Sequence, residues 1–268
     1  MKRVSWLVVF SFLLILSLAG CSAGNSAQPS QNAAQVKPTE IMISAAASLQ
    51  NSLTEIQKVY TQKTPGVKLN FSFGASGTLQ QQIEQGAPVD LFISAAKAQM
   101  NTLEKENLIV KDSRIDLLGN DLVLITGKDN NKVTSLEDLS KSNVSQISIG
   151  TPKSVPAGQY AQEALMSLKL WNSLQSKLVM AKDVTTVLNY VETGNADAGF
   201  VYQSDAQGST KVKVVTVVPS SSYKPVVYPA AVIAATKNKQ ATEDFLKYLQ
   251  SSDAQKIFAK YGFKSLVK

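Results

Sequence analysis

Apolar positions in the first part of the chain alternate between a strand period and a helix period. Strands are predicted at 41–43, 67–73 and 89–93, and helices over 49–60 and around the apolar pair Leu79 and Ile83. Pro65-Gly66 ends the first helix, and the small residues of 74–77 form a turn before the second. Because each strand is followed by a helix, this part of the chain predicts a parallel sheet with helices on both faces.

A second series of the same kind begins near Asp121. Strands are predicted at 121–126, 146–150, 178–181, 198–202, 211–218 and 226–235, and helices after 156–158, over 184–191, and around 245–249 and 257–261. We therefore predict an α/β fold of two lobes, each a mostly parallel sheet flanked by helices, joined by a hinge of crossing strands. The first lobe is expected at 40–120 plus 231–268 and the second at 121–230, with 121–126 and 226–235 as the crossing segments.

The N-terminal segment has the pattern of an export signal rather than of a folded element. Met1-Lys2-Arg3 is followed by an apolar run to Leu18, which is short for a membrane span. The segment 18–21, Leu-Ala-Gly-Cys, resembles a bacterial lipobox, which implies cleavage before Cys21 and lipidation of that residue. Residues 21–39 are polar and rich in Ser, Ala, Gln and Asn, as in a flexible tether. We expect a signal peptide at 1–20 and a protein held by lipid on the outer face of the cell membrane.

Composition removes many classes of enzyme and metal protein. The chain has no histidine and one cysteine. Histidine-dependent catalytic triads, histidine-ligated metals and cysteine-cluster metal sites are therefore excluded, and no cofactor or directly ligated metal is expected. The net charge is +7, but only two of the 27 basic residues are arginines and the lysines are scattered. This pattern is typical of a solvated surface and does not indicate a nucleic-acid partner.

Four predicted helix starts could face a ligand at the carboxyl ends of the strands. They lie at Ser48, at Ser76, at 156–158 and at Val184, which follows Asp183. The first N–H groups of a helix lack intrahelical partners and attract anions. The alternative at each place is ordinary: a serine or Asp183 as a helix cap, and Pro-Ala-Gly as a turn.

Together, several stretches are similar to one known family. They are 43–49 (ISAAASL), 73–79 (FGASGTL), 86–95 (GAPVDLFISA), 155–161 (VPAGQYA), Glu192 with 197–202 (DAGFVY), and 257–263 (IFAKYGF). In this order they resemble the extracytoplasmic molybdate-binding proteins of ABC importers. The resemblance extends from about Ile41 to Phe263.

The resemblance implies a hinged, type II periplasmic-binding-protein-like fold that holds molybdate or tungstate between its lobes and delivers it to an ABC importer permease. The family's ligand-holding positions fall on Ser48, Ser76, Ala157, Val184 and Tyr202. None of these is Lys or Arg, so neutral dipoles would hold the anion. The family's serines on either side of Ser76 are replaced here by Ala75 and Gly77. A monomer is expected.

Two alternatives remain beside this interpretation. The ligand could be another tetrahedral oxyanion such as sulfate. Ser94-Ala95-Ala96-Lys97 also matches the S-x-x-K motif of penicillin-interacting serine enzymes, although the chain contains neither K-T-G nor S-D-N. The simpler interpretation is that Ser94 ends a buried strand and caps the next helix. We expect no enzymatic activity.

Overall fold

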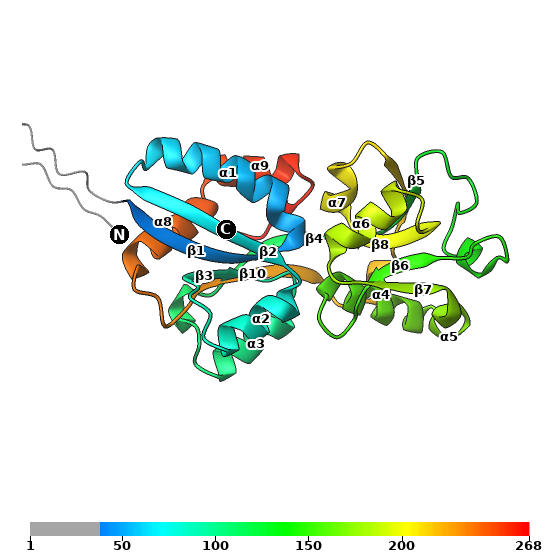
Figure 1. Ribbon diagram of the computed structural model, residues 1–268, viewed down its shortest axis with the longest axis horizontal. Coiled ribbons are helices and arrows are strands. Elements are labelled where there is room, and N and C mark those ends of the chain that lie inside the picture. Colours follow the sequence, from blue (N-terminus) through cyan, green and yellow to red (C-terminus); the bar gives the residue numbers. More distant parts are fainter. Residues whose placement is uncertain (1–37, 268) are drawn as a thin grey trace, which may run out of the picture. The chain divides into compact units, whose positions relative to one another are not determined.

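The computed structural model describes residues 38–267, which form two sheets flanked by helices (Figure 1). The predicted signal peptide, Cys21 and nearly all of the predicted tether lie outside the described residues. The first sheet has the order β11 (Lys264–Ser265), β4 (Ile115–Asn120), β10 (Val226–Val232), β3 (Leu91–Ile93), β1 (Thr39–Ala46) and β2 (Val67–Gly74). Its helices are α1 (Gln50–Lys63), α2 (Ser76–Glu84), α3 (Lys97–Lys105), α8 (Lys239–Leu249) and α9 (Ser252–Lys260). We call this sheet with its helices the first lobe.

The second lobe is built on the other sheet. Its strands have the order β7 (Leu178–Ala181), β6 (Ile147–Gly150), β8 (Ala198–Tyr202), β5 (Leu122–Gly127) and β9 (Val212–Val217). Its helices are α4 (Pro156–Ser167), α5 (Trp171–Leu174), α6 (Val184–Glu192) and α7 (Gln203–Gln207). The predicted two-lobed α/β fold is confirmed. The sheets are mixed, because β10 runs antiparallel to β3 and β4 and β5 runs antiparallel to β8 and β9.

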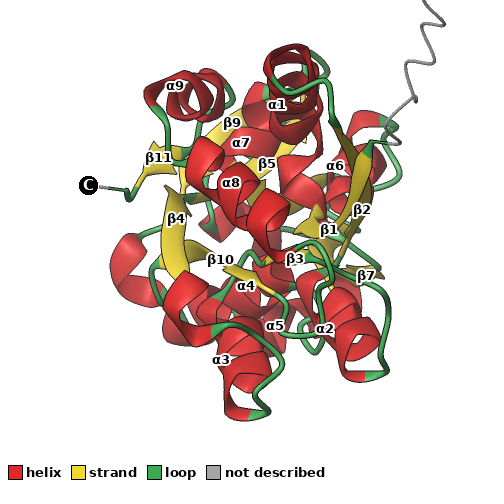
Figure 2. Cartoon of the chain, turned by 90° about the vertical axis from the view of Figure 1, so that its left-hand side faces the viewer, coloured by secondary structure: helices red, strands yellow, loops and turns green. Residues whose placement is uncertain are grey.

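Alternating side chains of the first sheet pack into two separate apolar layers, one on each face of the sheet. On β3, Leu91 and Ile93 lie in the larger core cluster, whereas Phe92 lies in a smaller one with Leu79 and Met100. Helices α2 and α3 therefore cover one face of this sheet, and α1, α8 and α9 cover the other (Figure 2). A strand buried on both faces carries apolar residues at consecutive positions, as this one does.

The chain crosses between the lobes twice. Strand β4 ends at Asn120 and β5 begins at Leu122, so the first crossing is immediate. The chain returns over 218–225, and β10 begins at Val226. The division that we expected between 230 and 231 therefore falls inside β10, because this whole apolar strand pairs with β4 and β3 of the first sheet. Within the described residues, no helix has both the length and the apolar character that crossing a membrane requires.

Candidate oxyanion-binding site

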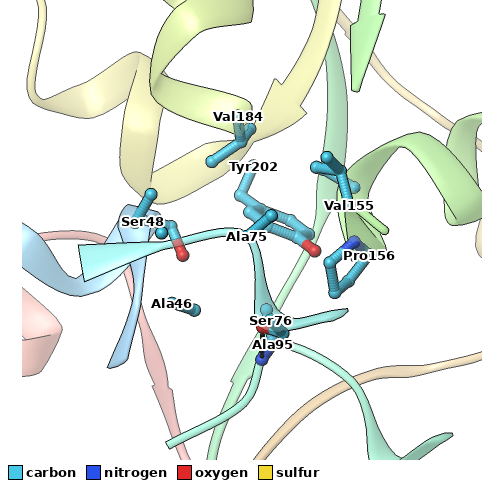
Figure 3. Close-up of a pocket in the computed structure, with 12 residues that line it drawn as sticks. Ala46, Ser48, Ala75, Ser76, Ala95, Val155, Pro156, Val184 and Tyr202 are labelled. Carbon is cyan, nitrogen blue, oxygen red and sulfur yellow. Dashed lines mark hydrogen bonds between the residues drawn. The ribbon is translucent and has the colours of Figure 1, made fainter. Parts of the chain in front are cut away.

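A small pocket lies where helix starts of the two lobes face each other (Figure 3). Its volume is about 10 Å³, so little free space remains inside. The lining comprises Ala46, Ala47, Ser48, Gly74, Ala75, Ser76 and Ala95 of the first lobe and Val155, Pro156, Ala157, Val184 and Tyr202 of the second. The structure thus brings all five predicted ligand-holding positions together around one space.

The two serines are contributed by the first lobe, and each is hydrogen-bonded from behind. Ser48 lies in a short 3₁₀ turn after β1, and its Oγ is 2.9 Å from the Tyr228 hydroxyl. Ser76 is the first residue of α2 and is buried. The backbone N–H of Ala95 donates to its Oγ over 2.9 Å (Figure 3). In this bond the Ser76 hydroxyl is the acceptor, so its hydrogen is left for a ligand.

The position of Ala157 depends on a close backbone contact between Gly150 and Gly158. It is the second residue of α4, directly after Pro156, a residue type suited to a first helical turn. A Cβ on the next residue, Gly158, would lie 1.8 Å from the carbonyl oxygen of Gly150, at the end of β6. Only glycine allows this contact, which holds the start of α4 and its free N–H groups against the strand end.

Val184 begins α6 and is preceded by a side-chain cap. The Asp183 carboxylate accepts the backbone N–H of Thr186 over 2.7 Å and the hydroxyl of the same residue over 2.8 Å. The prediction that Asp183 caps its own helix is therefore confirmed. Val184 itself lines the pocket, and as the first residue of α6 it carries an N–H that has no partner within the helix.

Tyr202 supplies a hydroxyl that has no partner within residues 38–267. It ends β8, is 1% exposed, and lines the pocket. Burial raises the pKa of its phenol, so the group stays protonated and can donate. Its backbone N–H donates to the carboxylate of Asp205, whose pKa burial raises to about 7. A buried donor without an acceptor is costly, so this hydroxyl is suited to bind an incoming acceptor.

The lobes also touch directly beside the pocket. The N–H of Gly77, in the first turn of α2, donates to the carbonyl oxygen of Ser154 over 2.9 Å. A Cβ at Gly77 would lie 2.7 Å from that oxygen, nearer than real Cβ contacts allow. Sequence reasoning marked Gly77 only as the loss of a flanking serine. The structure shows that the absence of a side chain is what lets the two backbones meet.

Electrostatically, the pocket is a set of neutral donors. None of its lining residues is charged. Three helices, α2, α4 and α6, begin at its wall, and their N-terminal dipole ends favour negative charge. Hydroxyls from three of the lining residues add directional donors. The arrangement is suited to a small, fully ionised anion that accepts hydrogen bonds on all sides.

The serine and the lysine of the S-x-x-K motif do not line the pocket. Ser94 is buried, and its Oγ bonds the backbone of Ala96 as both donor and acceptor. The prediction that Ser94 caps the next helix is wrong, because α3 begins at Lys97 with no side-chain cap. Lys97 Nζ lies 2.6 Å from a carboxylate oxygen of Asp116.

Most of the sequence matches a family of known proteins. Residues 41–264 match the bacterial extracellular solute-binding protein family. The matched region contains every residue of the pocket.

Individual relatives match over most of their length. A protein of Bacillus subtilis named as an ABC transporter substrate-binding lipoprotein is 43% identical over 254 residues, 94% of each chain. The molybdate-binding protein ModA of Haemophilus influenzae is 40% identical over 230 residues, 84% of this chain and 90% of that one. A solved substrate-binding domain, described as belonging to a molybdenum ABC transporter from Clostridium difficile, is 48% identical. It covers 85% of this chain and 99% of that one, with a TM-score of 0.67.

Proposed function

This chain belongs to the bacterial extracellular solute-binding proteins, and we propose that within this family it captures molybdate or tungstate and delivers it to an ABC importer. Relatives of 40% and 48% identity, whose names specify molybdate or molybdenum, support this ligand. The proposed ligand-holding residues are Ser48, Ser76, Ala157, Val184 and Tyr202.

One observation carries the proposal: five potential donors from separate elements line a space without any charged side chain. A hydrogen bond to a charged group contributes about 1.5–3 kcal/mol net. Several such bonds are enough for sub-micromolar affinity, on the order of −8 kcal/mol, after the loss of ligand motion. Neutral donors also leave no uncompensated charge in the empty pocket, which a buried lysine would.

The proposal also covers the membrane anchor and the partners of the protein. We propose that the chain acts as a monomer on the extracytoplasmic face of the membrane, held by a lipid on Cys21 and handing its anion to the permease of the importer. A relative named as a lipoprotein, 43% identical, supports the anchor. No resident cofactor and no enzymatic activity are proposed, because the function needs only binding and release. Absence of nitrocefin hydrolysis is the expected result for the Ser94-Lys97 motif.

The direct test is a titration of the purified protein with a panel of oxyanions. Sulfate is the second candidate ligand, since it is also a fully ionised tetrahedral dianion. It is smaller than molybdate and should not reach donors of both lobes together. Phosphate keeps at least one proton at neutral pH, and that O–H would face a donor. Calorimetry should therefore rank molybdate near tungstate, sulfate far below, and phosphate negligible. If sulfate alone binds tightly, the ligand of this protein is sulfate and the proposal of molybdate is wrong.

A further inference from the structure

Beneath the pocket, a buried hydrogen-bond chain ends at Ser48. The hydroxyl of Tyr228, on β10, lies 2.9 Å from Ser48 Oγ, and Tyr228 is fully buried. On its other side, Nδ2 of Asn120 lies 3.4 Å from the same Tyr228 hydroxyl. Asn120 is the last residue of β4, where the chain leaves the first lobe, and it too is buried.

The neighbours of Asn120 fix the direction of this chain. Its Oδ1 accepts the backbone N–H of Asp121 over 2.9 Å, so Nδ2 is the group that faces the other way. Nδ2 also donates to the hydroxyl of Ser204, on α7, over 2.8 Å. An amide nitrogen can only donate. Asn120 therefore offers the phenol oxygen of Tyr228 a donor and no acceptor.

The phenol hydrogen then has one partner within the described residues. Burial raises the pKa of the Tyr228 phenol, so the hydroxyl keeps its proton. Its ring is fixed by edge-on contacts with Tyr202 and Phe263, at centroid distances of 5.8 and 5.4 Å. Since Asn120 Nδ2 cannot accept, the phenol donates to Ser48 Oγ. That bond occupies one of the two lone pairs of Ser48 Oγ and leaves the hydrogen of this hydroxyl for a ligand.

We infer that Tyr228 is a specificity-determining residue, which acts through Ser48 to make this hydroxyl a donor and so disfavour protonated oxyanions. The inference rests on the proposed function. Tyr228 does not line the pocket and is a positioning residue. Without the phenol O–H, the Ser48 hydroxyl can rotate and accept a hydrogen bond from the O–H of a ligand such as hydrogen phosphate.

The test is the Tyr228→Phe variant of the full-length protein in detergent, titrated with molybdate and with inorganic phosphate at neutral pH. We expect molybdate to bind about two- to tenfold more weakly, the effect of one neutral hydrogen bond. The affinity for phosphate should fall by a smaller factor or should rise, so that the ratio of molybdate affinity to phosphate affinity falls. A merely structural role would weaken both anions by the same factor, and that result, or wild-type values for both, would overturn the inference.

Three further measurements make the result specific. In a Ser48→Ala background, Tyr228→Phe should have no added effect, whereas a full additional effect would contradict action through Ser48. Tyr248→Phe removes a hydroxyl that has no partner within residues 38–267 and is the matched control. Asn120→Asp offers the phenol of Tyr228 an acceptor on the side away from Ser48. It should therefore also lower the ratio of molybdate affinity to phosphate affinity, and it replaces Tyr228→Phe as the test if that variant does not fold. If the wild-type protein binds neither anion, the proposed function and this inference are both overturned. If the wild-type protein binds molybdate but Tyr228→Phe leaves the ratio of molybdate affinity to phosphate affinity unchanged, the inference alone is overturned.

Discussion

Replacing Gly77 with alanine should weaken ligand binding while it changes the stability of the folded protein little. Gly77 lies in the first turn of α2, where its N–H meets the carbonyl oxygen of Ser154 in the other lobe. A Cβ there would lie 2.7 Å from that oxygen and 2.9 Å from Ser154 Cα. Both neighbours are backbone atoms, so no side chain can turn away to make room.

The size of the effect follows from the required movement. Ordinary contacts of a Cβ begin near 3.4 Å, so the two backbones must separate by roughly 0.7 Å at this point. The separation breaks the contact between the lobes, which contributes about 0.5–1.5 kcal/mol. It also lengthens the bonds from α4 to an anion held by the first lobe, each worth about 1.5–3 kcal/mol. A loss of one such bond or its equivalent makes the affinity about ten- to a hundredfold lower.

Stability should change little, because the lost contact of about 0.5–1.5 kcal/mol is offset by the helix preference of alanine. Alanine in place of glycine in a helix contributes about 0.5–1 kcal/mol when its backbone fits. Calorimetry with molybdate gives the affinity, and thermal unfolding without ligand gives the stability. Gly66→Ala is the matched control, because nothing lies within 4 Å of a Cβ at that position. Wild-type affinity of Gly77→Ala would show that the two backbones do not meet in the ligand-bound protein. A parallel fall in melting temperature would instead indicate damage to the fold.

Three further predictions concern the serine donors, closure and pH. Ser76→Ala should bind molybdate about ten- to a hundredfold more weakly by calorimetry, because it loses a charged hydrogen bond, whereas the exposed Ser72→Ala should not change it. Since the proposed donors come from both lobes, small-angle scattering should show a smaller radius of gyration with molybdate than without, and equal radii at saturation would contradict closure. Burial raises the pKa of Asp205 to about 7, above its unfolded value near 4. The folded state therefore holds a proton that the unfolded state has lost, and stability should fall as pH rises from about 4 to 7. Asp205→Asn should flatten this slope in urea titrations, and an unchanged slope would remove Asp205 as its cause.

Local periodicity was enough to predict most of the elements and the two-lobed fold. Alternation over 67–73 and the helical spacing from Leu49 to Tyr60 correspond to β2 and α1. The turn at 74–77 and the Pro-Ala-Gly sequence at 156–158 marked the starts of α2 and α4. These signals work because strand and helix periods differ and because proline and small residues punctuate them. The proposed site could be located from sequence since it is made of such starts.

Features that depend on distant parts of the chain could not be predicted in this way. Strand β4 was missed because Asp116, Gly119 and Asn120 interrupt its apolar pattern, and it is a strand through its pairing with β10. The hydrogen bond between Ser48 and Tyr228 joins residues 180 positions apart. Periodicity carries no information about such pairs, because their contact depends on how the sheets assemble.

The same limit applies to the polarity of the site. A serine at a helix start predicts a hydroxyl near an anion, but a serine hydroxyl accepts as readily as it donates. The Ala95 N–H occupies one lone pair of the Ser76 oxygen from behind and leaves the hydroxyl hydrogen for the pocket, and the Tyr228 hydroxyl stands in the same relation to Ser48. Both supporting donors come from other strands or loops of the first lobe. Discrimination between an unprotonated and a protonated oxyanion therefore depends on groups that do not line the pocket but hydrogen-bond to its serines. Mutations of these groups should change the choice of anion more than the stability of the folded protein.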